Sequence, residues 1–113
     1  MKNIITIVLF FLSVNLVFSQ DSQEFAQLML DTEMSNDMLK ELDQSIREKD
    51  QVLVCRVDIP TKRVFILSKA GQELSETMIR SWFVEKNASF KCFYKGIYKL
   101  DPVQKFPFQN CDQ

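Results

Sequence analysis

The residue types that most enzymatic chemistry requires are scarce in this chain of 113 residues. There is no histidine, which excludes Ser–His and Cys–His nucleophile pairs and removes the commonest general base and metal ligand. The acidic residues fall mainly at helix spacing on faces expected to meet solvent, and no convergent carboxylate pair is evident. Two glycines cannot form a phosphate-binding loop. We therefore predict a protein that is not an enzyme and holds no cofactor.

Three methionines, Met29, Met34 and Met38, surround one short polar stretch of the chain. Thioether sulfur is a soft ligand suited to Cu(I), so this group could bind copper outside the cytoplasm. Packing is the favoured explanation, because Met34 and Met38 fit a helix start and methionine commonly fills gaps in a core. Periplasmic copper binding, or a thiol carrier that uses Cys55, is the alternative function.

Lysines and aromatic residues interleave near the C-terminus. The series is Lys91, Phe93, Tyr94, Lys95, Tyr98, Lys99, Lys105, Phe106 and Phe108. A basic and aromatic surface could bind single-stranded nucleic acid, but the net charge of −1 and the expected export of the chain oppose that partner. We predict instead a small non-catalytic binding domain with an unknown protein or glycan partner. Its contact surface would be formed by Phe93, Lys95, Tyr98, Phe106 and Phe108.

Residues 1–19 have the organisation of a secretory signal peptide, with Lys2 before an apolar run that continues to Phe18. Ser19 offers the small side chain that signal peptidase requires, which places the cut before Gln20. The run is shorter than the roughly 20 residues of a membrane-spanning helix. We expect a periplasmic or secreted product with no membrane contact after cleavage. The short N-terminal start and the Ser-Gln junction resemble those of exported proteins of the Bacteroidetes.

The remaining residues suffice for one domain, which we place at 20–100, followed by a tail at 101–113 that packs on it. Helices are predicted over 35–49 and 75–87. Each begins with a serine in the context of an N-cap, and apolar residues then recur at helical spacing.

A β-hairpin is predicted over 51–58 and 62–68, two runs rich in β-branched and apolar residues. Alternation in the first run places Leu53 and Cys55 on one face. Arg56 lies on the opposite, wetter face.

A last strand is predicted over 90–95, with Gly96 bulging or turning it. Residues 24–30 fit either a helix or a buried central strand, because the apolar run is too short for its period to decide. A strand there completes β-α-β-β-α-β, whereas a helix would leave a poor sheet for two amphipathic helices. We therefore predict an α+β, ferredoxin-like fold, with an antiparallel sheet and two helices on one face.

In this element order, residues 25–92 resemble a heavy-metal-associated domain, the small ferredoxin-like module of copper chaperones and metal-pumping ATPases. The resemblance lies in element order, element lengths and the hydrophobic hairpin with Val57-Asp58 before its turn. In that family a Cys-x-x-Cys pair in the loop before the first helix holds the metal. The corresponding residues 31–38 contain no cysteine, so the resemblance implies the fold and no metal ligand.

Three cysteines in an exported chain imply one disulfide and one free thiol, or an intermolecular bridge. The ferredoxin-like strand order 4-1-3-2 places Cys55 and Cys92 on opposite edges, about 14 Å apart. A disulfide tolerates about 7 Å between Cα atoms. We predict a Cys92–Cys111 bond with Cys55 as a buried thiol. The alternative is a Cys55–Cys111 bond, with the tail crossing to the other edge.

Overall fold

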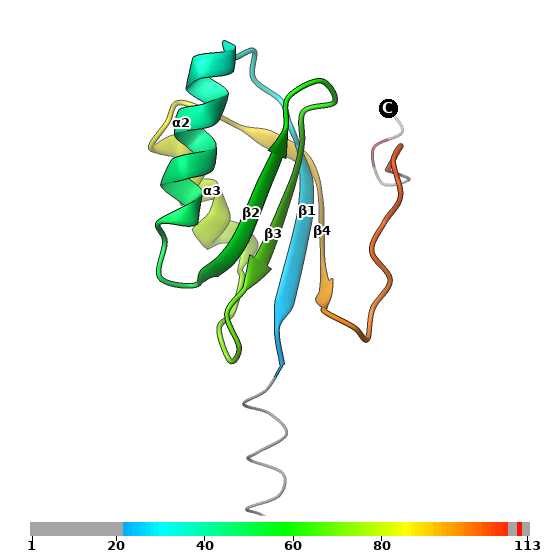
Figure 1. Cartoon of the computed structure of the whole chain (residues 1–113). Helices are drawn as coiled ribbons and strands as arrows, with labels where there is room; N and C mark the ends of the chain where they lie inside the picture. The colour runs from blue at the N-terminus through cyan, green and yellow to red at the C-terminus, as the bar shows by residue number, and fades with distance from the viewer. Residues whose placement is uncertain (1–21, 109–110, 112–113) are drawn as a thin grey trace, which may run out of the picture.

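Four strands and two helices follow one another along the chain in the order β-α-β-β-α-β (Figure 1). The computed structural model describes residues 22–108 and 111, so the predicted signal peptide lies outside the described residues. The elements are β1 (Glu24–Leu30), α2 (Asn36–Arg47), β2 (Val52–Asp58), β3 (Arg63–Ser68), α3 (Glu76–Val84) and β4 (Phe90–Ile97). Within the described ranges, no helix is long and apolar enough to cross a membrane.

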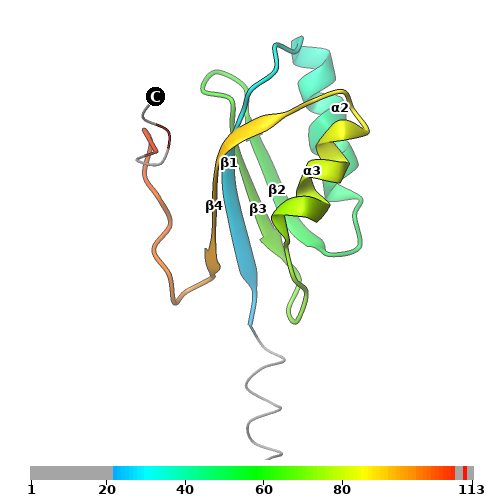
Figure 2. The same cartoon turned by 180° about the vertical axis from the view of Figure 1, so that it is seen from behind.

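The four strands form one antiparallel sheet in the order β2-β3-β1-β4. This is the predicted order 4-1-3-2 counted from the other edge. Both helices cover the same face of the sheet, as the two opposite views show (Figures 1 and 2). The architecture is compatible with the ferredoxin-like fold. Residues 24–30, which periodicity alone could not assign, form a central strand as the architectural argument predicted.

The helices begin where their caps predict. The Ser35 Oγ accepts a hydrogen bond from the Met38 amide at 3.2 Å, and the Ser75 Oγ accepts one from the Met78 amide at 3.1 Å. Each bond satisfies one of the amides that a helix N-terminus leaves without an intrahelical partner. The second helix ends at Val84, before the left-handed Asn87, at which φ is 56°.

The core lies between the sheet and the two helices. Alternate residues of the central strands point into it, together with the apolar stripe of each helix. Its members include Ala26, Leu28, Leu30, Leu39, Leu42, Ile46, Val64, Ile66, Ile79, Trp82 and Phe83. Burying a side chain such as Leu or Phe contributes about 1.5–3 kcal/mol, so this layer holds the helices on the sheet.

The predicted alternation in β2 is wrong at Leu53. A bulge shifts the register with β3 between Val52 and Val54, so one extra residue interrupts the alternation. Leu53 is 56% exposed, while Cys55 is 2% exposed and lies in the core. The prediction of a buried Cys55 thiol is confirmed, and Arg56 is exposed as predicted.

The last strand continues through Gly96 to Ile97, beyond its predicted end. Gly96 pairs with Phe25, and a Cβ at Gly96 would lie 2.9 Å from two ring carbons of Phe25. The glycine is required by this close approach rather than by a turn. The irregularity of β4 comes earlier, at Cys92, where φ is 60°.

Candidate functional site

The outer face of the sheet, opposite the helices, is divided into a covered half and an open half. The tail after β4 runs back along the sheet on the side away from the helices (Figure 2). The Gln27 side-chain amide donates to the Gln104 carbonyl at 2.9 Å, and the Gln104 amide donates to the Gln27 Oε1 at 2.8 Å. The Tyr94 hydroxyl donates to the Pro102 carbonyl at 3.1 Å. The tail therefore satisfies a buried glutamine of the central strand and covers β1 and β4.

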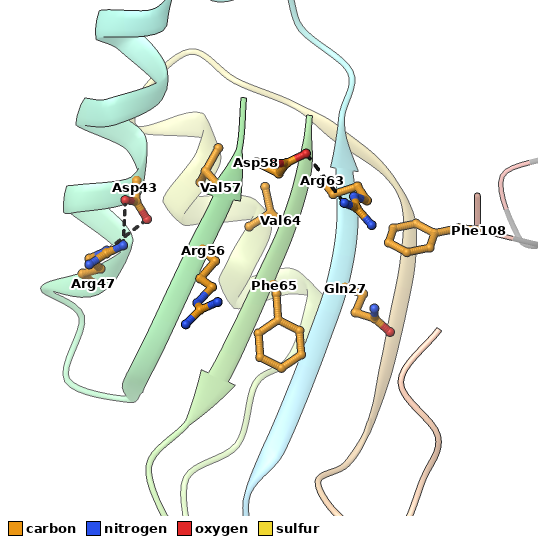
Figure 3. A pocket seen from close by; sticks show the side chains of 10 residues that line it. All are labelled: Gln27, Asp43, Arg47, Arg56, Val57, Asp58, Arg63, Val64, Phe65 and Phe108. Atoms are coloured by element: carbon orange, nitrogen blue, oxygen red, sulfur yellow. Dashed lines mark hydrogen bonds and ion pairs between the residues drawn. The ribbon is translucent and has the colours of Figure 1, made fainter. Parts of the chain in front are cut away.

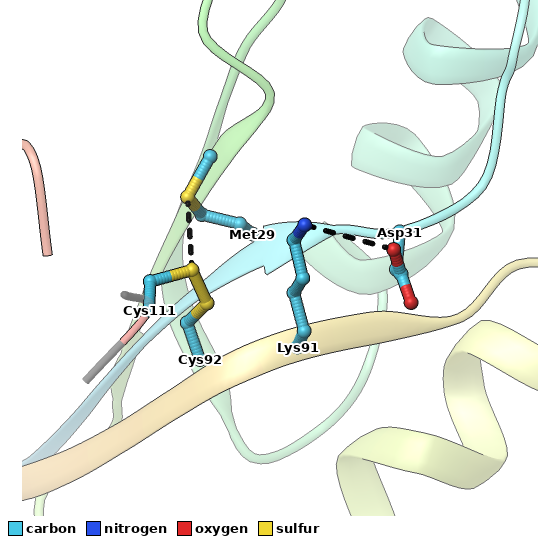
Figure 4. The surroundings of a disulfide bond; sticks show 5 residues. All are labelled: Met29, Asp31, Lys91, Cys92 and Cys111. Atoms are coloured by element: carbon cyan, nitrogen blue, oxygen red, sulfur yellow. Dashed lines mark hydrogen bonds and ion pairs between the residues drawn. A yellow bond between two sulfur atoms is a disulfide. The ribbon is translucent and has the colours of Figure 1, made fainter. Parts of the chain in front are cut away.

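A cysteine pair lies near the end of the tail. Cys92 and Cys111 are at disulfide distance, with their Cα atoms 5.0 Å apart (Figure 4). The Cys111 sulfur lies 3.7 Å from the Met29 sulfur on β1. Beside the pair, Lys91 and Asp31 form an ion pair at 3.8 Å. A disulfide between these two cysteines would fix the tail to β4, the strand that carries Cys92.

The five residues of the predicted contact surface lie in different surroundings. Phe93 packs against the helix-side core, and Phe108 is 5% exposed. Lys95 forms an ion pair with Glu24 at 3.1 Å. Only Tyr98 and Phe106 present large exposed rings. The structure does not gather the five into one exposed patch.

The three methionines considered for copper are also separated. Met29 lies beside the cysteine pair, whereas Met34 packs against the helix-side core. Met38 is 42% exposed on α2. Among the described residues, no group of three or more His, Cys, Asp or Glu side chains could hold a metal ion.

Residues of the open half of the outer face and residues of α2 together line a pocket of about 520 Å³ (Figure 3). Its lining comes from three strands, the C-terminal half of α2 and the tail. We call this pocket the arginine groove. It is lined by Gln27, Asp43, Arg47, Arg56, Val57, Asp58, Arg63, Val64, Phe65 and Phe108.

Two of the three arginines in the groove are neutralised by neighbours. Arg47 pairs with Asp43 at 3.1 Å, one helical turn away on α2. Arg63 pairs with Asp58 at 3.7 Å across the β2–β3 hairpin. Hydrogen bonds from the Thr61 hydroxyl and amide, together with Arg63, hold the pKa of Asp58 below its usual value. Asp58 is therefore a fully ionised partner at neutral pH.

Arg56 is the exception. Its guanidinium has no ion pair or hydrogen bond among the described residues, and it projects from β2 between the two neutralised arginines (Figure 3). Its cross-strand neighbour on the outer face is Phe65, whose ring stacks on Phe25. The groove therefore combines one uncompensated cation with an apolar floor. A guanidinium presents a rigid fork of donors that matches a carboxylate.

Sequence reasoning placed Arg56 on a wet face but did not identify the groove. Its walls come from Asp43 and Phe108, which are far apart in the sequence and meet only in the folded chain. No protein-family model, no curated protein and no solved structure matches this chain. The candidate site consequently depends on geometry and charge.

Proposed function

We propose that this chain is an exported, non-catalytic binding domain that takes a carboxylate-bearing segment of a partner protein in the arginine groove. The observation that carries the proposal is Arg56, an exposed arginine without a counter-ion in a pocket where the other two arginines have one. The remaining groove charges cancel in pairs. The site therefore favours one negative charge rather than a dense polyanion.

A protein segment fits the groove better than a glycan does. Sugar rings bind to exposed aromatic faces, but Phe108 is buried and one face of Phe65 is stacked on Phe25, with the ring centroids 6.1 Å apart. The exposed guanidinium of Arg56 suits a side-chain carboxylate, with which it can form two parallel hydrogen bonds. Export agrees with the predicted signal peptide and with a cysteine pair at disulfide distance.

The test is a titration of the purified protein, followed by NMR, with a blocked Ala-Glu-Ala-Glu-Ala-Glu-Ala peptide. A peptide with glutamine at each glutamate position is the ligand control. We expect shifts at Arg56, Phe65 and Phe108 with the glutamate peptide only. Arg56→Gln should weaken binding about tenfold, since a charge-assisted hydrogen bond is worth more than 1 kcal/mol. Lys40→Gln, the same charge change on the exposed face of α2, should leave binding unchanged.

Equal binding by Arg56→Gln and the parent protein would contradict the proposal. Stronger binding of polygalacturonate than of the glutamate peptide, lost in Arg56→Gln, would make the ligand an acidic glycan instead. Because Arg56 is exposed, the variant should keep its stability, which thermal unfolding would verify.

A further inference from the structure

The edge of the sheet beside the arginine groove is open. β2 pairs only with β3, and no other described strand lies on its free side. After the bulge at Leu53, the register is regular from Val54↔Leu67 to Asp58↔Arg63. A strand in this position presents a row of backbone N–H and C=O groups without partners.

Two of the devices that block an edge strand, proline and lysine, are missing from this stretch. Residues 54–58 contain no proline and no lysine, and the bulge is confined to the residue before them. The opposite edge is different. β4 is irregular at Cys92, where φ is 60°, and the tail runs beside it in both views (Figures 1 and 2).

The free edge of β2 also borders hollow space on both sides. A second pocket, of about 340 Å³, is lined by Arg47, Leu53, Val54, Cys55 and Arg56. It shares Arg47 and Arg56 with the arginine groove, so the two pockets adjoin along the edge. An extended chain laid along β2 would therefore have room for its side chains.

We propose that β2 receives an extended segment of the partner protein as an added strand, with a carboxylate side chain of that segment on Arg56. This inference rests on the proposed function and specifies its binding mode. Val54 and Arg56 share the outer face of β2, two positions apart. Side chains directly opposite on neighbouring strands lie about 4.5–5.5 Å apart at Cβ. The segment therefore carries an acidic residue with an apolar residue two positions away on the same face.

A second copy of this chain fits the edge poorly. An antiparallel twofold pairing that uses the whole stretch from Val54 to Asp58 sets Arg56 directly against the Arg56 of the other copy. Like charges placed opposite each other destabilise a strand pair. The positive charge that attracts an acidic segment therefore disfavours self-association.

The test uses a blocked peptide, Thr-Val-Thr-Glu-Thr-Val-Thr, and two N-methylated forms of it. One form is methylated at alternate amides starting from the first residue, and the other form is methylated at the remaining amides. In an added strand only one of these sets donates to β2, because amides alternate in direction along a strand. We expect one form to bind within about twofold of the parent peptide. The other should lose at least about tenfold, the effect of one to two hydrogen bonds.

Two further measurements accompany the titration. Hydrogen exchange should slow at alternate amides of residues 54–58 when the peptide is bound. Arg56→Gln should weaken all binding forms, while Lys40→Gln should not.

Each remaining outcome overturns the inference. Equal loss or equal binding for the two methylated forms would refute strand addition and leave carboxylate binding standing if Arg56→Gln still weakens it. Absence of binding at millimolar peptide would refute strand addition in the same way if the alanine–glutamate peptide still binds. A concentration-dependent dimer in sedimentation, strengthened by Arg56→Gln, would identify a second copy as the occupant.

Discussion

Removing the Cys92–Cys111 cross-link should destabilise the domain by an amount that follows from the position of the cysteines. The two residues are separated by 19 positions. Closing a loop of this length in the unfolded chain corresponds to about 3 kcal/mol of stabilisation in the entropic treatment. In a domain of this size each kcal/mol shifts the melting temperature by about 4–8 °C, so the double variant Cys92→Ser, Cys111→Ser should melt about 12–24 °C lower.

Thermal and urea unfolding, followed by circular dichroism without reductant, would measure this change. Each single variant should lose as much stability as the double variant, because either substitution removes the cross-link. The m-value should rise on removal, since an unlinked unfolded chain exposes more surface. A loss below about 1 kcal/mol would refute the reasoning. It would show that the tail detaches before the sheet unfolds, so that the cross-link constrains the tail alone.

Three other predictions concern single residues. Burial raises the pKa of the Cys55 thiol, so it should not react with Ellman's reagent at about pH 8 until urea unfolds the protein; reaction in the native state would contradict its burial. The pKa of Asp58 is lowered in the folded state, chiefly by the hydrogen bond from Thr61. The folded protein therefore loses stability as the pH falls below 3.8, the ordinary pKa of an aspartate, because protonation of Asp58 favours the unfolded state. Asp58→Asn should therefore lose less stability than the parent between about pH 4 and pH 2 in urea titrations, and an identical pH dependence would contradict the assignment. Gly96→Ala should cost about 1–3 kcal/mol, because the added Cβ meets the Phe25 ring at 2.9 Å; a urea midpoint equal to that of the parent would show that the ring moves freely.

The helix starts and the strand order are predictable because their causes are local or topological. A serine cap acts on an amide three residues away, so Ser35 and Ser75 are visible in the sequence. The order of elements then restricts the sheet to few arrangements. Even the ambiguous residues 24–30 could be assigned, since two amphipathic helices require a sheet wide enough to cover them.

The bulges and the groove could not be predicted, because they depend on contacts that form only in the folded chain. Whether Leu53 is an extra residue depends on the pairing of β2 with β3, and strict alternation contains no sign of it. The same holds at Cys92 on β4, where the irregularity accompanies a Phe93 that packs against the core. The uncompensated state of Arg56 follows from which carboxylates lie near it in space, and spacing along the chain does not contain that information.

The buried Cys55 has a consequence for the order in which the chain oxidises. The core that encloses it comprises residues that precede the tail, so the thiol can be buried before Cys111 docks. A buried thiol with a raised pKa supplies almost no thiolate, and disulfide exchange proceeds through thiolate attack. If the sheet assembles before the tail docks, Cys55 takes no part in disulfide exchange, and Cys92 and Cys111 remain to react with each other. We therefore expect the order of folding to favour the Cys92–Cys111 cross-link and to leave the Cys55 thiol unreactive.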